Sequence, residues 1–318
     1  MAIKKKRVFI TGIAGFIGMH TALALQARGD EVFGCDNFNS SYDPALKFAR
    51  KEKLQEAGIA VFQKDIHDLE SLNNCTHLVH LAAQPGVRYS VQHPEQVMSA
   101  NMNGLIHILE LLKNSGAELI FASSSSVYGQ NEKVPFAESD VTIHPSSLYA
   151  ATKMAGELIC HSYHHLYKIP MRLLRFFTVY GPWGRPDMAY YLFADAIATN
   201  QPIQVFNHGK MERDFTYIDD IVQGILASID ANFAFEVFNL GNSHTETLST
   251  FISLIEEKMG KRAEKNMLPM QKGDVTRTFA DISKAEKLLG FSPKVPLDEG
   301  LDHFVNWFNA QTTLSRSS

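Results

Sequence analysis

The sequence predicts an α/β fold built on a doubly wound parallel sheet, followed by a smaller mixed α/β region. Three observations support this prediction. Short β-branched runs alternate with helix-like segments from residue 7 to about residue 177, which is typical of parallel strands joined by helices on both faces of a sheet. A glycine-rich turn separates the first run from the first helix. Glycine and proline then cluster at residues 178–186, where the regular alternation ends.

The composition is that of an ordinary globular protein. The chain has 318 residues and a net charge of -4, with 30 basic and 34 acidic residues and no long block of either sign. Neither nucleic acid nor a membrane surface is therefore expected as the main partner. Residues 4–7 are basic and are expected to lead into the first strand rather than to open a signal peptide. Cys35, Cys75 and Cys160 are far apart and form no C-x-x-C motif, so we expect no disulfide framework, no zinc site and a cytoplasmic location.

The first 36 residues have the features of a dinucleotide-binding unit. Arg7–Thr11 has the pattern of a strand, a turn with Gly12, Gly15 and Gly18 follows, and helix-like spacing leads to a second strand ending at Asp36. Glycines in such a turn allow backbone N–H groups to approach a pyrophosphate, and the acid can accept hydrogen bonds from the adenosine ribose. We therefore expect a Rossmann-type site for NAD, because the carboxylate would repel the 2′-phosphate of NADP.

The same patterns predict the remaining elements in order. Further strands of the main sheet are expected at residues 59–63, 76–81, 119–122 and 171–177. Helices are expected at residues 47–57, 95–113, 188–199, 247–259, 283–289 and 297–307, and the charged helix 47–57 is expected to be exposed. These predictions divide the chain into an NAD-binding domain of residues 1–180 and a smaller domain of residues 181–318, with residues 217–241 returning to the main sheet.

A second chemical motif follows the fifth predicted strand. Tyr149 and Lys153 are four positions apart, so in a helix their phenol and ammonium groups share one face. A nearby cation favours the phenolate, whereas a free tyrosine with a pKa near ~10 is a poor base at neutral pH. From this stretch alone, a surface pair on one helix face is the simpler interpretation. The upstream serines 123–126 lack the G-x-S-x-G elbow of a serine nucleophile.

Together, these motifs resemble the extended short-chain dehydrogenase/reductase family. The resemblance extends from about residue 7 to residue 307 and depends on the glycine turn with Asp36, the pair Asp65-Ile66, the serines before Val127-Tyr128-Gly129, and Tyr149 with Lys153. Within that family, two further stretches resemble the nucleotide-sugar 4-epimerases. They are Arg213-Asp214-Phe215 followed by Asp219-Asp220, and Gly273-Asp274-Val275.

The resemblance implies an NAD-dependent enzyme that acts on a UDP-sugar and keeps its cofactor through each turnover. Tyr149 would be the catalytic base, Lys153 would hold the nicotinamide ribose and lower the pKa of the tyrosine, and Ser124 would hydrogen-bond the 4-hydroxyl of the sugar. The residues expected to bind the cofactor are Gly12, Gly15, Phe16, Ile17, Gly18, Asp36, Asp65, Ile66, Leu81, Ala82, Ala83, Asn101, Tyr149 and Lys153.

The residues beside the Val-Tyr-Gly motif favour one reaction. Relatives that remove water or carbon dioxide resemble one another in carrying an acidic residue there, and this chain has Ser125 and Ser126. Epimerisation through a 4-keto sugar needs no second acid or base and is therefore preferred. Residues 84–90 and 177–189 resemble the UDP-glucuronate 4-epimerase branch. A UDP-glucose/UDP-galactose or N-acetylhexosamine 4-epimerase is the alternative, and a non-catalytic NAD-binding regulator is the alternative from another class.

A uronic acid adds one requirement, because oxidation at carbon 4 makes it a β-keto acid that tends to lose its carboxylate. Hydroxyl and guanidinium donors are expected to hold that carboxylate in an orientation that disfavours its loss. Arg213 is expected to pair with the diphosphate and Asp274 with the uridine ribose, while Arg277 is left open between phosphate and solvent. The expected substrate residues are Arg88, Ser125, Ser126, Thr178, Arg185, Val205, Arg213 and Asp274.

Two further features concern metals and partners. His161, His164 and His165 have the spacing of metal ligands on a helix, but they lack an H-E-x-x-H motif or a third ligand, so an exposed face and no metal are expected. The resemblance implies a homodimer formed by helices at about residues 95–113 and 148–167. Their apolar stripes alone would equally suit packing inside one chain.

Overall fold

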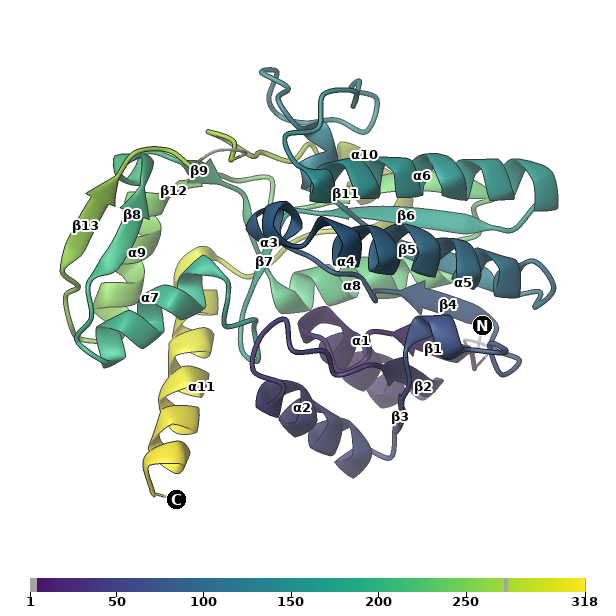
Figure 1. Ribbon diagram of the computed structural model, residues 1–318, viewed down its shortest axis with the longest axis horizontal. Helices are drawn as coiled ribbons and strands as arrows, with labels where there is room; N and C mark the ends of the chain where they lie inside the picture. Colours follow the sequence, from purple (N-terminus) through teal and green to yellow (C-terminus); the bar gives the residue numbers. More distant parts are fainter. Residues whose placement is uncertain (1–4, 272–273, 318) are drawn as a thin grey trace.

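A seven-stranded parallel sheet forms the centre of the protein, in the order β11-β6-β5-β4-β1-β2-β3 (Figure 1). The computed structural model describes residues 5–271 and 274–317, so Gly273 of the predicted turn lies outside the described residues. The strands are β1 (Arg7–Thr11), β2 (Glu31–Asp36), β3 (Ala60–Gln63), β4 (His77–His80), β5 (Glu118–Ser124), β6 (Met171–Phe176) and β11 (Phe235–Leu240). The predicted doubly wound α/β fold is confirmed.

Helices cover both faces of this sheet (Figure 1). Side chains alternate along β1, so Val8 and Ile10 belong to the core on one face and Phe9 to the core on the other. The first face is covered chiefly by α1 and α8, and the second by α5 and α6. The helices of this layer are α1 (Phe16–Arg28), α2 (Ala45–Glu56), α3 (Val87–Gln92), α4 (Pro94–Met98), α5 (Gly104–Leu112), α6 (Leu148–Tyr167), α8 (Ile218–Asp230) and α10 (Ser283–Leu289).

Two helical predictions need adjustment. The helix predicted at residues 95–113 consists of α4, a π-helical turn Ser99–Asn103 and α5. The expectation that the charged helix at 47–57 is exposed was wrong for Lys47 and Arg50, which are both buried. The physical reason is that Arg50 points away from solvent, where its guanidinium donates hydrogen bonds to the carbonyl of Trp183 at 3.1 and 2.5 Å.

The part of the chain after residue 177 adds three small two-stranded sheets, β10-β7, β12-β9 and β13-β8. Its strands are β7 (Thr178–Tyr180), β8 (Ile203–Phe206), β9 (Glu212–Arg213), β10 (Phe215–Tyr217), β12 (Glu246–Thr247) and β13 (Lys265–Leu268), and its helices are α7 (Ala189–Ala198), α9 (Leu248–Lys258) and α11 (Leu297–Ser317). The polar stretch 209–215, for which the sequence predicts no strand, contains β9 and the start of β10, whose two or three residues are too few for a periodic pattern.

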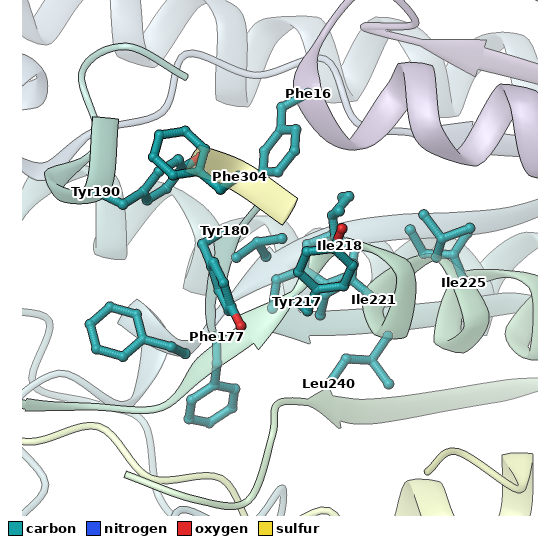
Figure 2. Packing of buried hydrophobic residues seen from close by; sticks show 14 of the residues in the cluster. Phe16, Phe177, Tyr180, Tyr190, Tyr217, Ile218, Ile221, Ile225, Leu240 and Phe304 are labelled. Atoms are coloured by element: carbon teal, nitrogen blue, oxygen red, sulfur yellow. The ribbon is translucent and has the colours of Figure 1, made fainter. Parts of the chain in front are cut away.

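One hydrophobic core joins these small sheets to the main sheet. Figure 2 shows Phe16 of α1 in the same cluster as Tyr180, Tyr190 and Phe304. The Tyr190 and Phe304 rings meet edge to face with centroids 4.9 Å apart, and Tyr180 lies 6.4 Å from Tyr190. Among the described residues, no helix has both the length and the apolar character needed to cross a bilayer.

Candidate active site

A cavity of about 910 Å³ lies beyond the carboxyl ends of the main-sheet strands. This is the edge at which parallel α/β sheets bind ligands, because the loops after successive strands meet there. The structure brings most of the predicted site residues to its wall. They are Gly12, Gly15, Phe16, Ile17, Gly18, Asp36, Asp65, Ile66, Leu81, Ala82, Ala83, Ser124, Ser125, Ser126, Tyr149, Lys153, Thr178 and Arg185.

The glycine turn after β1 is packed so closely against the neighbouring backbone that a side chain at Gly12 or Gly18 would collide with it. Gly12 has a φ of +71°, and a Cβ there would lie 2.9 Å from the backbone nitrogen of Ala82. A Cβ on Gly18 would lie 2.2 Å from the carbonyl oxygen of Gly12. Helix α1 starts after Gly15 with no side-chain cap and no acidic residue in its first turn. Its first N–H groups therefore remain available to an anion, as a pyrophosphate requires.

Two carboxylates lie at the ends of the next strands. Asp36 ends β2, where it accepts hydrogen bonds from the backbone N–H groups of Phe38 (2.9 Å) and Ala14. Burial raises the pKa of Asp36, and these N–H donors oppose that shift. Asp65 follows β3, where it accepts hydrogen bonds from the backbone N–H of His67 (3.0 Å) and the amide of Asn37 (2.7 Å). The turn, the uncapped helix and Asp36 together fit a dinucleotide with free ribose hydroxyls.

The predicted catalytic residues converge at the other end of the cavity. Ser147 caps α6 by accepting a hydrogen bond from the N–H of Ala150 at 3.1 Å, so the helix starts immediately before Tyr149. The phenol of Tyr149 is hydrogen-bonded to Ser124 at the end of β5. The ammonium of Lys153 donates a hydrogen bond to the carbonyl of Ala122 at 2.8 Å and lies 6.0 Å from the centre of the Tyr149 ring.

Burial dominates the electrostatics of this pair. It raises the pKa of Tyr149, while the hydrogen bond from Ser124 and the charge of Arg185 act in the opposite direction. Burial also lowers the pKa of Lys153 to about 8. Lowering of the tyrosine pKa by Lys153 stays a prediction. Arg185 is a cation whose charge favours the phenolate.

The wall beside the tyrosine carries hydroxyl groups and one guanidinium. Ser125, Ser126 and Thr178 line it, and the hydroxyl oxygens of Ser124 and Ser126 lie 3.1 Å apart. Arg185 lines the same wall and donates hydrogen bonds to Asp187 at 3.0 and 2.5 Å. Among the described residues, the carboxylates that line the cavity are Asp36, Asp65 and Glu95. None of these belongs to the serine segment beside Tyr149.

Comparison with known proteins supplies the family. A model of the NAD dependent epimerase/dehydratase family matches residues 8–241. The chain belongs to this family. An uncharacterised protein of Methanocaldococcus jannaschii is 50% identical over 96% of this chain and 97% of its own length. UDP-glucuronate 4-epimerase 4 of Arabidopsis thaliana is 46% identical over 95% of this chain and 75% of its own length.

A solved structure extends this comparison. The crystal structure of UDP-glucuronic acid 4-epimerase from Bacillus cereus, in complex with UDP-glucuronic acid and NAD, superposes with a TM-score of 0.92 and 35% identity, covering 96% of this chain and 99% of that one. NAD is the cofactor of this epimerase/dehydratase family. The glycine turn, the uncapped α1 and Asp36 are the groups that fit it here.

The other predicted site residues of this family member lie outside the cavity wall. Asn101 is buried, where its side chain bonds to the backbone of Gln84 (2.7 and 3.2 Å) and to Thr152 (3.0 Å), so it braces the loop after β4 against α6. The guanidinium of Arg88 lies 5.0 Å from the centre of the Phe206 ring. Val205 is buried in β8.

Arg213 and Asp274 face each other. Their side chains form an ion pair at 2.6 Å, so a diphosphate would have to share Arg213 with Asp274. Arg277, whose role the sequence left open, pairs with Glu212 at 2.8 Å and is partly exposed. Within the described residues, no group of three His, Cys, Asp or Glu side chains could hold a metal, and His161 and His164 pack against Phe235.

Sequence reasoning missed one group of residues on the cavity wall. Asn39, Tyr42 and Lys47 line it, and the ammonium of Lys47 donates hydrogen bonds to the side-chain and carbonyl oxygens of Asn39 at 2.7 and 2.9 Å. Its charge lowers the pKa of Asp36 against the effect of burial. The available signal was the polar loop directly after the acid that ends β2. The contribution of Lys47 was hidden because α2 has the charged composition of an exposed helix.

Proposed function

We propose that the protein is a UDP-glucuronate 4-epimerase, which interconverts UDP-glucuronate and UDP-galacturonate through a 4-keto sugar. One observation carries this proposal: Tyr149, bonded to Ser124 and facing Arg185, is the acid–base group on a wall whose serine segment contains no carboxylate. A single base suffices to remove and return one proton at one carbon, whereas dehydration requires a second acid or base. The likeness to the Arabidopsis thaliana and Bacillus cereus enzymes supports the same sugar.

The reaction assigns a task to each residue. Ser124 receives the 4-hydroxyl of the sugar, and the Tyr149 phenolate takes its proton as the carbon is oxidised. NAD, when bound, would supply the hydride acceptor for this oxidation and, in its reduced form, the hydride donor for the opposite face of the sugar. Tyr149 then gives the proton back to the new 4-hydroxyl. Lys153, beside the tyrosine, holds the nicotinamide ribose, and Gly12, Gly15 and Gly18 leave space for the pyrophosphate.

The carboxylate of the sugar is held by the donors around the tyrosine. Ser125, Ser126, Thr178 and Arg185 line the same wall, and hydroxyl and guanidinium groups are suitable donors to a carboxylate. Fixing the carboxylate keeps its bond to the ring out of the orientation in which a β-keto acid loses carbon dioxide. A Thr178→Ala variant should therefore form some UDP-pentose beside the epimer. Unchanged epimerisation without a pentose product would contradict this role of Thr178.

Domain division, oligomer and location complete the proposal. Residues 1–180 would bind NAD and residues 181–318 the UDP-sugar, with Arg213 and Asp274 directed to its diphosphate and ribose.

A second copy of the chain would pack against α4, α5 and α6, which carry exposed apolar side chains. These are Met98, Ile106, Leu158, Leu166 and Tyr167. All three cysteines are free thiols, which supports a reducing compartment such as the cytoplasm.

The substrate can be tested without a coupling enzyme. Purified protein is incubated with UDP-glucuronate, and separately with UDP-glucose, while the sugar proton signals are followed by NMR. Conversion of UDP-glucuronate to UDP-galacturonate alone is the expected result. Conversion of UDP-glucose alone would instead indicate a UDP-glucose 4-epimerase. Conversion of neither sugar, with NAD bound, would indicate the non-catalytic regulator.

A further inference from the structure

The inference concerns Arg50 on α2, which is fully buried. Its guanidinium makes five hydrogen bonds, which matches the five N–H donors of the group. The acceptors are the carbonyl of Trp183 (3.1 and 2.5 Å), the carbonyl of Gly184 (3.2 Å), the carbonyl of Ala14 (3.2 Å) and the hydroxyl of Tyr42 (2.7 Å). One side chain therefore ties together three segments that are far apart in the sequence.

All four acceptor groups are uncharged, which distinguishes Arg50 from two arginines that are buried in the main sheet. Arg172 pairs with Glu118 at 2.6 Å, and Arg175 pairs with Glu157 at 2.7 Å. Arg50 has no carboxylate within 4.0 Å among the described residues. A buried cation without an acid in contact is unfavourable for stability, and Asp36 interacts with Arg50 only over a longer distance, so the position of Arg50 calls for another explanation.

The anchored segments carry the two ends of the site. Ala14 lies in the glycine turn, where its N–H donates to Asp36 and its carbonyl accepts from Arg50. Both sides of this residue are thus fixed, and its carbonyl oxygen, which would repel a pyrophosphate, is held by the guanidinium. The other two carbonyls belong to Trp183 and Gly184, directly before Arg185. Trp183 has a φ of +61°, a conformation that non-glycine residues rarely adopt.

We propose that Arg50 is a positioning residue that joins the cofactor turn to the loop carrying Arg185, and thereby couples binding of the dinucleotide to binding of the UDP-sugar. The reference to a UDP-sugar rests on the proposed function. Order imposed on either segment is passed to the other, because both share one rigid, planar donor. Coupling of this kind is reciprocal, so each ligand must strengthen the binding of the other by the same factor.

Release of NAD from the holoenzyme tests this coupling without requiring turnover. The rate of release is measured with and without UDP-glucuronate, whose carboxylate is the group that Arg185 would hold, for the wild type, Arg50→Met and Arg50→Lys. In the wild type, UDP-glucuronate should slow release by about tenfold, within the usual range of such couplings. Arg50→Met should release NAD faster and show no effect of UDP-glucuronate. Arg50→Lys keeps the charge but cannot reach three carbonyls with one ammonium, so it too should lose the effect of UDP-glucuronate.

The control is Glu52→Gln, which changes a charge at an exposed position of the same helix. It should release NAD at the wild-type rate and keep the full effect of UDP-glucuronate. Circular dichroism establishes that each variant is folded. A folded Arg50→Met or Arg50→Lys protein that keeps the wild-type effect of UDP-glucuronate would overturn the inference, as would a wild type without any effect. Failure of UDP-glucuronate to react would overturn the proposed function but leave this result intact.

Discussion

Burial acts against the charged forms of both Tyr149 and Lys153. It raises the pKa of the phenol and lowers that of the ammonium to about 8, so Lys153 loses its proton at a lower pH than Tyr149. The phenolate must then draw on Ser124 and on the charge of Arg185, which both favour it. At the scale of single residues, the site depends on Arg185 as well as on the Tyr–Lys pair that the sequence displays.

The buried ammonium of Lys153 should also make stability depend on pH. Its pKa is about 8 in the folded chain and near 10.5 in the unfolded chain, so the unfolded state binds more protons between these values. Below pH 8 the buried charge of Lys153 lowers the free energy of unfolding. This loss is regained as the pH rises toward 10, because the ammonium of the folded chain gives up its proton. From pH 7 to 9, the wild type should gain about 1 kcal/mol of unfolding free energy relative to Lys153→Met.

Urea unfolding of both proteins at pH 7 and pH 9 measures this difference. Lys258→Met serves as the control, because that lysine forms its ion pairs at the surface with Asp298 and Asp302. Its difference from the wild type should not change in the same direction. A wild type that loses stability relative to Lys153→Met as the pH rises would contradict the assigned burial of the ammonium.

At the scale of elements, the turn between β1 and α1 can be tested with a pair of glycines matched in backbone conformation. Gly12 has a φ of +71°, and a Cβ added to it would lie 2.9 Å from the backbone nitrogen of Ala82. Gly116 has a φ of +70°, with nothing within 4 Å. Alanine at either site should cost about 1 kcal/mol of stability through the backbone alone. Only the Gly12→Ala variant should also bind NAD more weakly than the wild type, by at least about tenfold, because its turn must open to admit the new side chain.

The measurement is the NAD content of each purified variant after denaturation, compared with its urea midpoint. Equal NAD content in folded Gly12→Ala and Gly116→Ala would show that the close approach of Gly12 to Ala82 is not needed for the cofactor.

The proposed dimer is also a prediction about elements. Leu158 and Leu166 lie two turns apart on α6 and are 73% and 64% exposed. Replacing both with glutamate should place charges in the contact and produce a monomer in analytical ultracentrifugation. Leu288→Glu on α10 is the control, because Leu288 is 39% exposed on another helix. A double variant that sediments like the wild type would exclude this face as the contact.

The sequence predicted the elements that have their own periodicity and missed those made by tertiary contact. The main-sheet strands from Arg7–Thr11 to Met171–Phe176 were found because β-branched runs repeat along the chain, and residues 217–241 were expected to return to that sheet. The helix α2 was placed correctly but its burial was not, because the acceptors of Arg50 include residues that lie more than a hundred positions away. For the same reason, the sequence could list Arg213 and Asp274 but could not show that they pair.

At the scale of the molecule, one continuous core connects the NAD-binding sheet with the region that follows it. The cavity wall is accordingly built from both parts, with Gly12 and Tyr149 from the first and Arg185 and Met188 from the second. The proposed reaction requires this arrangement, because the sugar must turn over between oxidation and reduction without leaving. A shared core keeps the two walls in register while the sugar changes orientation.

The most direct test of the account follows the hydrogen at carbon 4. UDP-glucuronate carrying deuterium at carbon 4 is incubated with the protein in ordinary water, with Tyr149→Phe as the control, and the product is examined by NMR. The account predicts UDP-galacturonate that retains deuterium at carbon 4, and a rate about a thousandfold lower in the control. Product that has lost this deuterium to solvent, or an unimpaired Tyr149→Phe variant, would contradict it.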